Sequence, residues 1–309
     1  DVADKFTSPI VAAKVNNVVT DLRTAVQADC RVEFLDLTST EGIRVYQRSL
    51  TFMLIAAAQE LFPDGEVTVE HSISKGLYCE VHLDRELTAR DVELLQERMQ
   101  AIVAEDRPIV RKVLPIDEAI RLFVASKQIE KVKLLRQLDR QEVSIYYCGD
   151  AYDYFYGTMV PSTGYLKVFE LKYYPPGLIL RYPEKEAPLI LPAFVEQPKL
   201  YQIFREAEEW GRILNCGYVS TLNDHINNGT VRDIIRVAEA LHERKLGQIA
   251  DYIASRRGKV RLILVSGPSA SGKTTFANRL NIHLRVNGVR PVPISLDDYF
   301  LERSDTPRD

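Results

Sequence analysis

The sequence contains no long apolar run. None of its hydrophobic stretches approaches the ~20 residues that a membrane-spanning helix needs, and its first residues show no signal-peptide pattern. The net charge is -3, which gives no global attraction to nucleic acid or to an anionic membrane, so such a partner must be met by a local patch. These absences favour a cytoplasmic protein without a membrane partner.

Cysteine and histidine are scarce. The four cysteines, Cys30, Cys79, Cys148 and Cys216, are far apart and include no C-x-x-C pair, so the sequence indicates free thiols rather than a zinc site or a disulfide framework. The five histidines stand singly, and isolated histidines are more often surface or structural residues than ligands. With 46% hydrophobic and 27% charged residues, the 309-residue chain is globular in composition and has room for two or three domains.

The most specific pattern predicts a strand, a glycine loop and a helix in succession. Residues 260–265 form a short apolar run of the kind expected in a central strand of a parallel sheet. Residues 267–274 then fill the G-x-x-x-x-G-K-[ST] pattern, and residues 275–286 have a helical pattern. Backbone N–H groups of such a loop turn inward around a phosphate, and the helix N-terminus adds its partial positive charge.

This loop predicts a site for ATP and Mg²⁺. Lys273 is placed to reach the β and γ phosphates, and Thr274 offers its hydroxyl to the metal ion. The predicted nucleotide-binding residues are Gly267, Pro268, Ser269, Ala270, Ser271, Gly272, Lys273, Thr274 and Thr275.

A pair of carboxylates follows a second short apolar run. Asp297 and Asp298 come after residues 292–296, which predict another strand, and Tyr299 follows them. A carboxylate at the carboxyl end of a strand beside a phosphate loop can hold Mg²⁺ or accept the proton of a substrate hydroxyl. We therefore predict that Asp297 is the base and that both aspartates are metal ligands. A turn or helix-cap role for the pair is the alternative.

The first part of the chain predicts small α+β domains. Asn16 and Asn17 suit a tight hairpin, residues 30–37 alternate as a half-buried strand, and residues 43–46 follow a turn, so we expect a small mixed β-sheet. A buried helix is expected over residues 49–61, and residues 67–81 alternate like strands.

Further helices and strands are expected downstream. Thr88 and Asp91 have the spacing of a capping box, and helical patterns follow at residues 115–123, 200–214 and 230–257. Between them, residues 142–169 predict strands and loops rich in tyrosine. The tyrosines of this stretch fit packing in a sheet or a stacking platform for nucleic acid, and they are Tyr146, Tyr147, Tyr152, Tyr154 and Tyr156.

Several segments of the first 180 residues resemble the N-terminal part of threonyl-tRNA synthetase, which is a β-grasp TGS domain followed by an editing domain. They are residues 14–16, 19–22, 41–42, 48–54, 73–78 and the helix start at 87–88. In that family the editing pocket is a metal-type cluster of two histidines one helical turn apart, joined by a cysteine and a third histidine from a later loop. In this chain the helix positions are Arg48 and Phe52, and the loop positions are Phe155 and Met159. None of the four supplies a base, a nucleophile or a metal ligand, so the resemblance implies a region that does not hydrolyse esters.

The phosphate loop, together with residues 295–300 and 306–309, resembles the uridine kinase and phosphoribulokinase family. The resemblance implies that Asp297 activates the acceptor hydroxyl and that Tyr299 borders a nucleoside site. Asp298 stands where many members carry serine. A synthetase-like region joined to a uridine-kinase-like domain also resembles a known bacterial arrangement of nucleoside kinases.

Four segments are therefore expected: a TGS-like β-grasp domain (1–47), an editing-domain-like α+β domain (48–185), a helical linker (186–258) and the start of an α/β P-loop kinase domain (259–309). The first hypothesis is ATP-dependent transfer of a phosphoryl group to a nucleoside-like acceptor. The second is a regulatory module that binds RNA or a small ligand, and the third, a tRNA-editing hydrolase, is disfavoured. Because P-loop domains have ~100 to 200 residues, we expect the chain to be cut early in its kinase domain and to be inactive alone.

Overall fold

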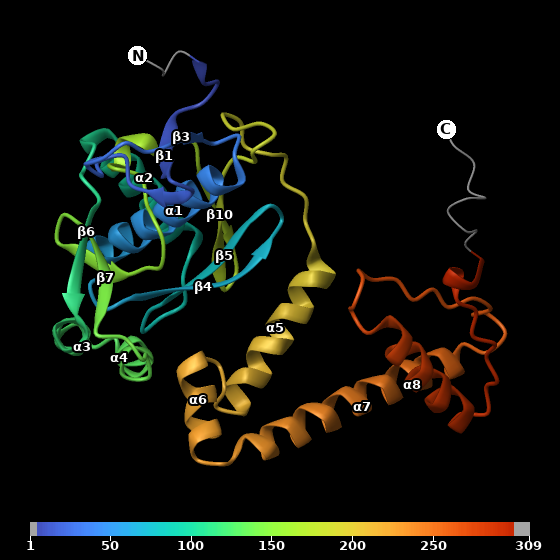
Figure 1. Ribbon diagram of the computed structural model, residues 1–309. Helices are drawn as coiled ribbons and strands as arrows, with labels where there is room; N and C mark the ends of the chain where they lie inside the picture. Colours follow the sequence, from blue (N-terminus) through green and yellow to red (C-terminus); the bar gives the residue numbers. More distant parts are fainter. Residues whose placement is uncertain (1–4, 300–309) are drawn as a thin grey trace. The chain divides into compact units, whose positions relative to one another are not determined.

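The computed structural model describes residues 5–299, which have a mixed α+β architecture and divide after Thr221 into two compact units. Figure 1 traces the helices and strands along the chain. In its described part, the first unit contains three small antiparallel sheets. Helix α1 (Thr40–Leu61) contributes to the largest core of this unit.

The first sheet has the order β2-β1-β3 and is formed by β1 (Ile10–Val15), β2 (Val18–Thr20) and β3 (Val32–Asp36). The predicted hairpin turn is confirmed, since Asn16 and Asn17 both have positive φ angles, 48° and 67°. Both strand pairs are antiparallel, so the expectation of a mixed sheet is wrong.

Helix α1 begins earlier than predicted. The Ser39 hydroxyl accepts a hydrogen bond from the Gly42 N–H at 3.0 Å and caps the first turn, while the helix ends just before Phe62 and Pro63. Every side chain from residue 49 to residue 58 is buried, as the apolar pattern indicated. Residues 43–46, expected to belong to the sheet region, lie in the first turns of the helix because Ser39 supplies its cap. The domain boundary expected after residue 47 therefore falls inside α1.

The second sheet has the order β4-β5-β10-β9, and all its neighbouring strands are antiparallel. It consists of β4 (Glu66–Ile73), β5 (Gly76–His82), β9 (Glu170–Tyr174) and β10 (Gly177–Arg181). Helix α2 (Ala89–Glu105) packs against α1 and β9, and its predicted capping box between Thr88 and Asp91 is confirmed. Hydrogen bonds from Arg85 hold the pKa of Asp91 well below its usual range, so this carboxylate stays charged at the helix start.

The third sheet, β6 (Val110–Pro115), β7 (Glu142–Cys148) and β8 (Ala151–Tyr154), is packed with α3 (Ile116–Ala125) and α4 (Ile129–Arg136) around a separate small core. The sequence did not predict α4. Four of the five tyrosines of this region pack against the cores, which favours the sheet-packing interpretation, whereas Tyr156 is 75% exposed.

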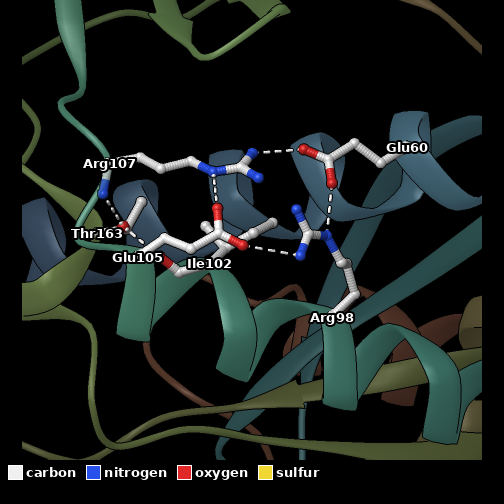
Figure 2. A network of polar contacts seen from close by, with 6 residues as sticks. All are labelled: Glu60, Arg98, Ile102, Glu105, Arg107 and Thr163. Carbon is white, nitrogen blue, oxygen red and sulfur yellow. Dashed lines mark hydrogen bonds and ion pairs between the residues drawn. The ribbon is translucent and has the colours of Figure 1, made fainter.

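A closed ring of charges joins the ends of α1 and α2 (Figure 2). Glu60 binds both Arg98 and Arg107, and Glu105 binds the same two arginines, with 2.9 Å between Arg98 Nη1 and Glu105 Oε1. The ring continues into the backbone, since Thr163 Oγ1 accepts from the Arg107 N–H and donates to the Ile102 carbonyl at 2.7 Å. The ring thus ties two helices to the loop before β6.

Replacing Glu60 by glutamine should lower the free energy of unfolding by about 0.5–1 kcal/mol at pH 7, because both arginines lose a charged acceptor. Burial pushes the pKa of Glu60 upward, but hydrogen bonds from Arg107 and Arg98 outweigh it and lower that pKa. A lowered pKa stabilises the fold above the ordinary glutamate value of about 4.3 and loses this contribution as the pH falls through the folded-state pKa. The difference between wild type and variant should therefore shrink in acid.

Urea unfolding measured between pH 3 and pH 7 checks this expectation. Glu93→Gln is the matched control, because Glu93 forms an exposed pair with Arg90 on α2. A loss for Glu60→Gln that equals the control at every pH would contradict the role of the ring.

The remaining helices are α5 (Pro198–Ile213), α6 (Val219–Asn227), α7 (Val231–Ser255) and α8 (Lys273–Val286), and 3₁₀ turns lie at Thr163–Tyr165 and Leu296–Tyr299. In the second unit, α7 packs against α8 through Leu246, Ala250, Leu280 and Leu284. Among residues 5–299, no helix is both long enough and apolar enough to cross a bilayer.

The two strands predicted around the phosphate loop are not formed. Residues 260–265 have no regular structure apart from a single bridge between Arg257 and Val260, and Leu264 is 82% exposed. Residues 292–295 are also irregular, and a 3₁₀ turn begins at Leu296. A β-strand needs a neighbour to satisfy its N–H and C=O groups, and the described part of the second unit contains no strand to pair with either segment.

Candidate functional site

The glycine loop leads directly into α8, as predicted. Gly272 is the N-cap of this helix and has a φ angle of 84°, a left-handed conformation that favours glycine at this position. Ala270 is also left-handed, with a φ angle of 60°. The loop therefore curls just before the helix N-terminus, where backbone N–H groups without helical partners attract anions.

The Lys273 side chain folds back over the loop. Its Nζ donates to the carbonyl oxygens of Gly267 at 2.8 Å and Pro268 at 2.7 Å. A Cβ added at Gly267 would lie 2.8 Å from the Ser271 hydroxyl, so the two ends of the loop approach each other closely. The Lys273 ammonium group is thus held beside the turn that is predicted from the sequence to bind phosphate.

An open hollow of about 550 Å³ lies beside the loop, within the second unit. Its apolar wall comes from Ile249 of α7, Phe276 and Leu280 of α8 and residues 263–265, and Gly272 and Lys273 line it as well. Ligand sites commonly have volumes of roughly 300–1,000 Å³ with mainly apolar walls and a few polar groups. The hollow is thus large enough for a nucleotide-sized ligand.

The structure brings only some of the predicted site residues together. Among them, the hollow is lined by Gly267, Pro268, Ser271, Gly272 and Lys273. Asp297, Asp298 and Tyr299 lie in the 3₁₀ turn and do not line the hollow. Because residues 292–296 form no strand, nothing in the described fold directs these side chains toward the loop. Phe300 and residues 306–309, which also entered the kinase resemblance, lie outside the described residues.

Three of the four positions of the synthetase-type pocket lie in or against the main core of the first unit, and the fourth, Arg48, contacts the same loop. The Phe52 ring on α1 contacts the Phe155 ring edge to face, with 5.7 Å between centroids, and Met159 is fully buried. One turn earlier on the helix, Arg48 Nη1 donates to the Thr158 carbonyl at 2.5 Å. Apolar packing and one arginine thus fasten the loop to α1.

These positions contain no chemistry for ester hydrolysis. Aromatic rings, a thioether and a guanidinium provide neither a general base nor a nucleophile at neutral pH. Within residues 5–299, no three His, Cys, Asp or Glu side chains gather closely enough to hold a metal ion. The described cysteines are free, as the sequence indicated.

The first unit also contains a buried ion pair that was not predicted from the sequence. Asp153 on β8 is 1% exposed, and its two carboxylate oxygens accept from Lys131 Nζ of α4 at 2.6 and 2.7 Å. Burial raises the pKa of Asp153, and the charge and hydrogen bonds of Lys131 oppose this shift. The available signal was the alternation of residues 151–154, which places Asp153 on the same face of the strand as Ala151, where a buried charge requires a partner.

His71 makes specific contacts that the sequence did not predict. Its ring stacks between Phe204 and Tyr78, with centroid distances of 3.9 and 5.1 Å, and its Nδ1 lies 3.2 Å from Glu208 Oε1. Burial lowers the pKa of His71 and raises that of Glu208 to about 6. The stacking joins α5 to the second sheet, so a structural role fits His71.

Comparison with known proteins supports the synthetase resemblance for about half of the chain. No family model matches the sequence. Threonine–tRNA ligase of Pelobacter propionicus is 34% identical over 161 residues, which is 52% of this chain and 25% of that protein. The enzyme of Janthinobacterium sp. is 35% identical over 162 residues (52% and 26%), and that of Coxiella burnetii is 30% identical over 171 residues (55% and 26%).

The chain spans about a quarter of the length of these curated relatives. They give no support for the uridine kinase resemblance, which rests on the phosphate loop and its neighbouring residues alone. What the comparisons establish is a threonyl-tRNA synthetase-like N-terminal region.

Proposed function

We propose that residues 259–309 belong to an ATP-dependent kinase that transfers a phosphoryl group to a hydroxyl of a nucleoside-like acceptor. The observation that carries this proposal is the curled loop at residues 267–274, with left-handed Gly272 at the start of α8 and Lys273 beside the turn. A hollow of nucleotide size next to the loop adds to it.

In this proposal the loop N–H groups and Lys273 bind the phosphates of ATP, and Lys273 stabilises charge on the transferring group. Asp297 accepts the acceptor hydroxyl proton as the hydroxyl oxygen bonds to the γ-phosphorus and the bond to the leaving ADP oxygen breaks. Tyr299 borders the acceptor. Mg²⁺ supplies further charge neutralisation when bound. Its assignment to Thr274, Asp297 and Asp298 rests on the loop pattern and on the place of the two aspartates in the sequence, since the described fold does not gather these residues.

Labelled ATP incubated with the full-length protein and a panel of nucleosides tests the kinase proposal. Transfer of label to a nucleoside hydroxyl supports it. ATP hydrolysis that no nucleoside changes, or no turnover with any acceptor, contradicts it.

The first unit is proposed to be a noncatalytic region that binds RNA or a small ligand. The observation in favour is the similarity of this region to enzymes named for tRNA, while Phe52, Phe155 and Met159 belong to the apolar core at positions where the resemblance implies a metal cluster. A gel shift with tRNA over a range of salt concentrations tests RNA binding, because phosphate contacts weaken steeply as salt rises.

We expect the chain to show no deacylase activity on mischarged threonine tRNA, because the pocket has neither a base nor a metal ligand. Release of the amino acid should match a buffer blank at every enzyme concentration. Hydrolysis that rises with enzyme concentration and disappears in Phe155→Ala would show that these residues form an active site after all.

A further inference from the structure

Arg48 is a half-buried cation for which the described residues provide no ion-pair partner. Its Nη1 atom donates a hydrogen bond to the Thr158 carbonyl oxygen, at 2.5 Å. Burial lowers the pKa of Arg48, and the charge of Arg44, one turn earlier on α1, acts in the same direction. Because burial without an opposite charge is unfavourable, this guanidinium gains from an anion that reaches its remaining N–H groups.

The loop opposite Arg48 is shaped to hold its guanidinium in place. A Cβ at Gly157 would lie 2.9 Å from Arg48 Cζ and 3.0 Å from both terminal nitrogens, so the guanidinium lies against the bare backbone there. The Gly157 carbonyl accepts from the Tyr146 hydroxyl at 2.6 Å, and the Val160 N–H donates to Ser49 at 3.0 Å. The guanidinium of Arg48 is therefore held in position before any ligand binds, which lowers the entropic cost of binding.

Other cations act on the Tyr146 hydroxyl, which donates to the Gly157 carbonyl of this loop. Arg111 on β6 is paired in register with Tyr146 on β7, and the charges of Arg111, Arg48 and Arg23 all oppose the rise that burial produces in the pKa of Tyr146. Asp21 compensates part of this charge, since it binds Arg23 at 3.0 Å. Neither Arg111 nor Arg44 has an ion pair within residues 5–299. The local field is therefore positive although the chain as a whole is negative.

The residue before Gly157 carries an exposed aromatic ring. Tyr156 directly precedes Gly157 and is 75% exposed, and the Arg140 guanidinium lies 5.8 Å from the centre of its ring. Proteins commonly bind a nucleotide by pairing its phosphate with a guanidinium and by stacking its nucleobase on an aromatic ring.

We propose that Arg48, in the positive field to which Arg111 contributes, binds the phosphate group of a nucleotide, and that Tyr156 stacks on its base. Arg48 occupies a position where the synthetase resemblance implies a metal-binding histidine. In the proposal this position binds an anion instead of a metal ion. This proposal deepens the ligand-binding role of the first unit, on which it rests, and does not depend on the kinase. The phosphate belongs either to a free nucleotide or to a single-stranded RNA.

Residue-resolved labelling of arginine with phenylglyoxal tests the site. The chain carries Lys273→Ala, which weakens phosphate binding at residues 267–274, and the labelled peptides are quantified by mass spectrometry. Inorganic phosphate, uridine monophosphate and a short oligouridylate are each compared with chloride at equal ionic strength. Labelling of Arg48 should fall about tenfold with saturating uridine monophosphate. Arg90, an exposed residue of α2, is the internal control and should be labelled equally throughout.

Two variants separate ligand binding from loop structure. Arg48→Met should weaken uridine monophosphate binding about tenfold, and Arg111→Gln, which leaves the Thr158 contact in place, should weaken it severalfold. Tyr156→Ala should weaken the mononucleotide but not inorganic phosphate. Circular dichroism confirms that each variant is folded.

Protection by the mononucleotide without stronger protection by the oligonucleotide identifies a free nucleotide, and the reverse identifies RNA; both support the phosphate site. Protection of Arg48 without any tRNA gel shift leaves the site standing and removes the RNA role. A tRNA shift that Arg48→Met and Arg111→Gln leave unchanged, or equal labelling of Arg48 in phosphate, nucleotide and chloride, overturns the site.

Discussion

Replacing Lys273 by alanine should lower phosphoryl transfer by the full-length protein by about two to three orders of magnitude, because a positioned cation that stabilises developing charge is lost. The Lys273 ammonium lies within 2.8 Å of the carbonyls of Gly267 and Pro268, beside the turn that would hold the phosphates. The fold should remain intact, since Lys273 is the first residue of α8 and alanine is a good helix former. Initial rates with labelled ATP and the preferred nucleoside measure the effect.

Lys199→Ala is the matched control, because Lys199 is an exposed lysine near the start of α5. Its turnover should equal that of the wild type, and circular dichroism should show the same helix content for both variants. Near-wild-type turnover in Lys273→Ala would remove the kinase assignment, even with unchanged nucleotide binding.

Replacing Lys131 by methionine should lower the free energy of unfolding by about 3 kcal/mol at pH 7, because it leaves a buried carboxylate without its counter-charge. Lys131 contacts both oxygens of Asp153, and the Tyr154 N–H, at 2.6 Å, is the only other donor found for that carboxylate in the described structure. Urea unfolding followed by circular dichroism measures the change. Lys133→Met, which alters a partly exposed pair with Glu130 on the same helix, should change the stability by no more than about 0.5 kcal/mol.

The loss in Lys131→Met should depend on pH in a defined direction. Burial raises the pKa of Asp153, and without Lys131 nothing of opposite charge opposes the rise. A carboxyl with a raised folded-state pKa binds protons more readily when folded, so stability is lost as the pH rises through that pKa. The variant should therefore recover stability relative to wild type as the pH falls from 7 toward the ordinary aspartate value of about 3.9. Adding Asp153→Asn should restore much of the stability at pH 7. A loss that is the same at pH 5 and pH 7, and that Asp153→Asn does not relieve, would show that packing rather than charge is responsible.

The candidate sites differ in how far the sequence predicts them. The phosphate loop is continuous in the chain, so its spacing already predicted the loop, the lysine and a helix that follows, while the left-handed Gly272 came from the structure. The synthetase-type pocket required a resemblance to pair α1 with a loop about 110 residues later, because no local pattern connects Arg48 with Thr158. The pair of Lys131 and Asp153 was missed, since it depends on a helix packing over a sheet.

Sequence patterns alone predicted the features that depend on neighbours within about one helical turn. The turn at Asn16 and Asn17, the capping box at Thr88 and Asp91, and helix α8 are of this kind, because a few side chains supply the required φ angles and hydrogen bonds. The strands and the long-range side-chain contacts depended on tertiary structure. Residues 260–265 have the composition of a strand but form none, because a strand depends on partners that its own residues cannot supply. Likewise, only packing placed Phe52 against Phe155 and left Arg48 as a half-buried cation beside Gly157, because these contacts cross more than a hundred residues of chain.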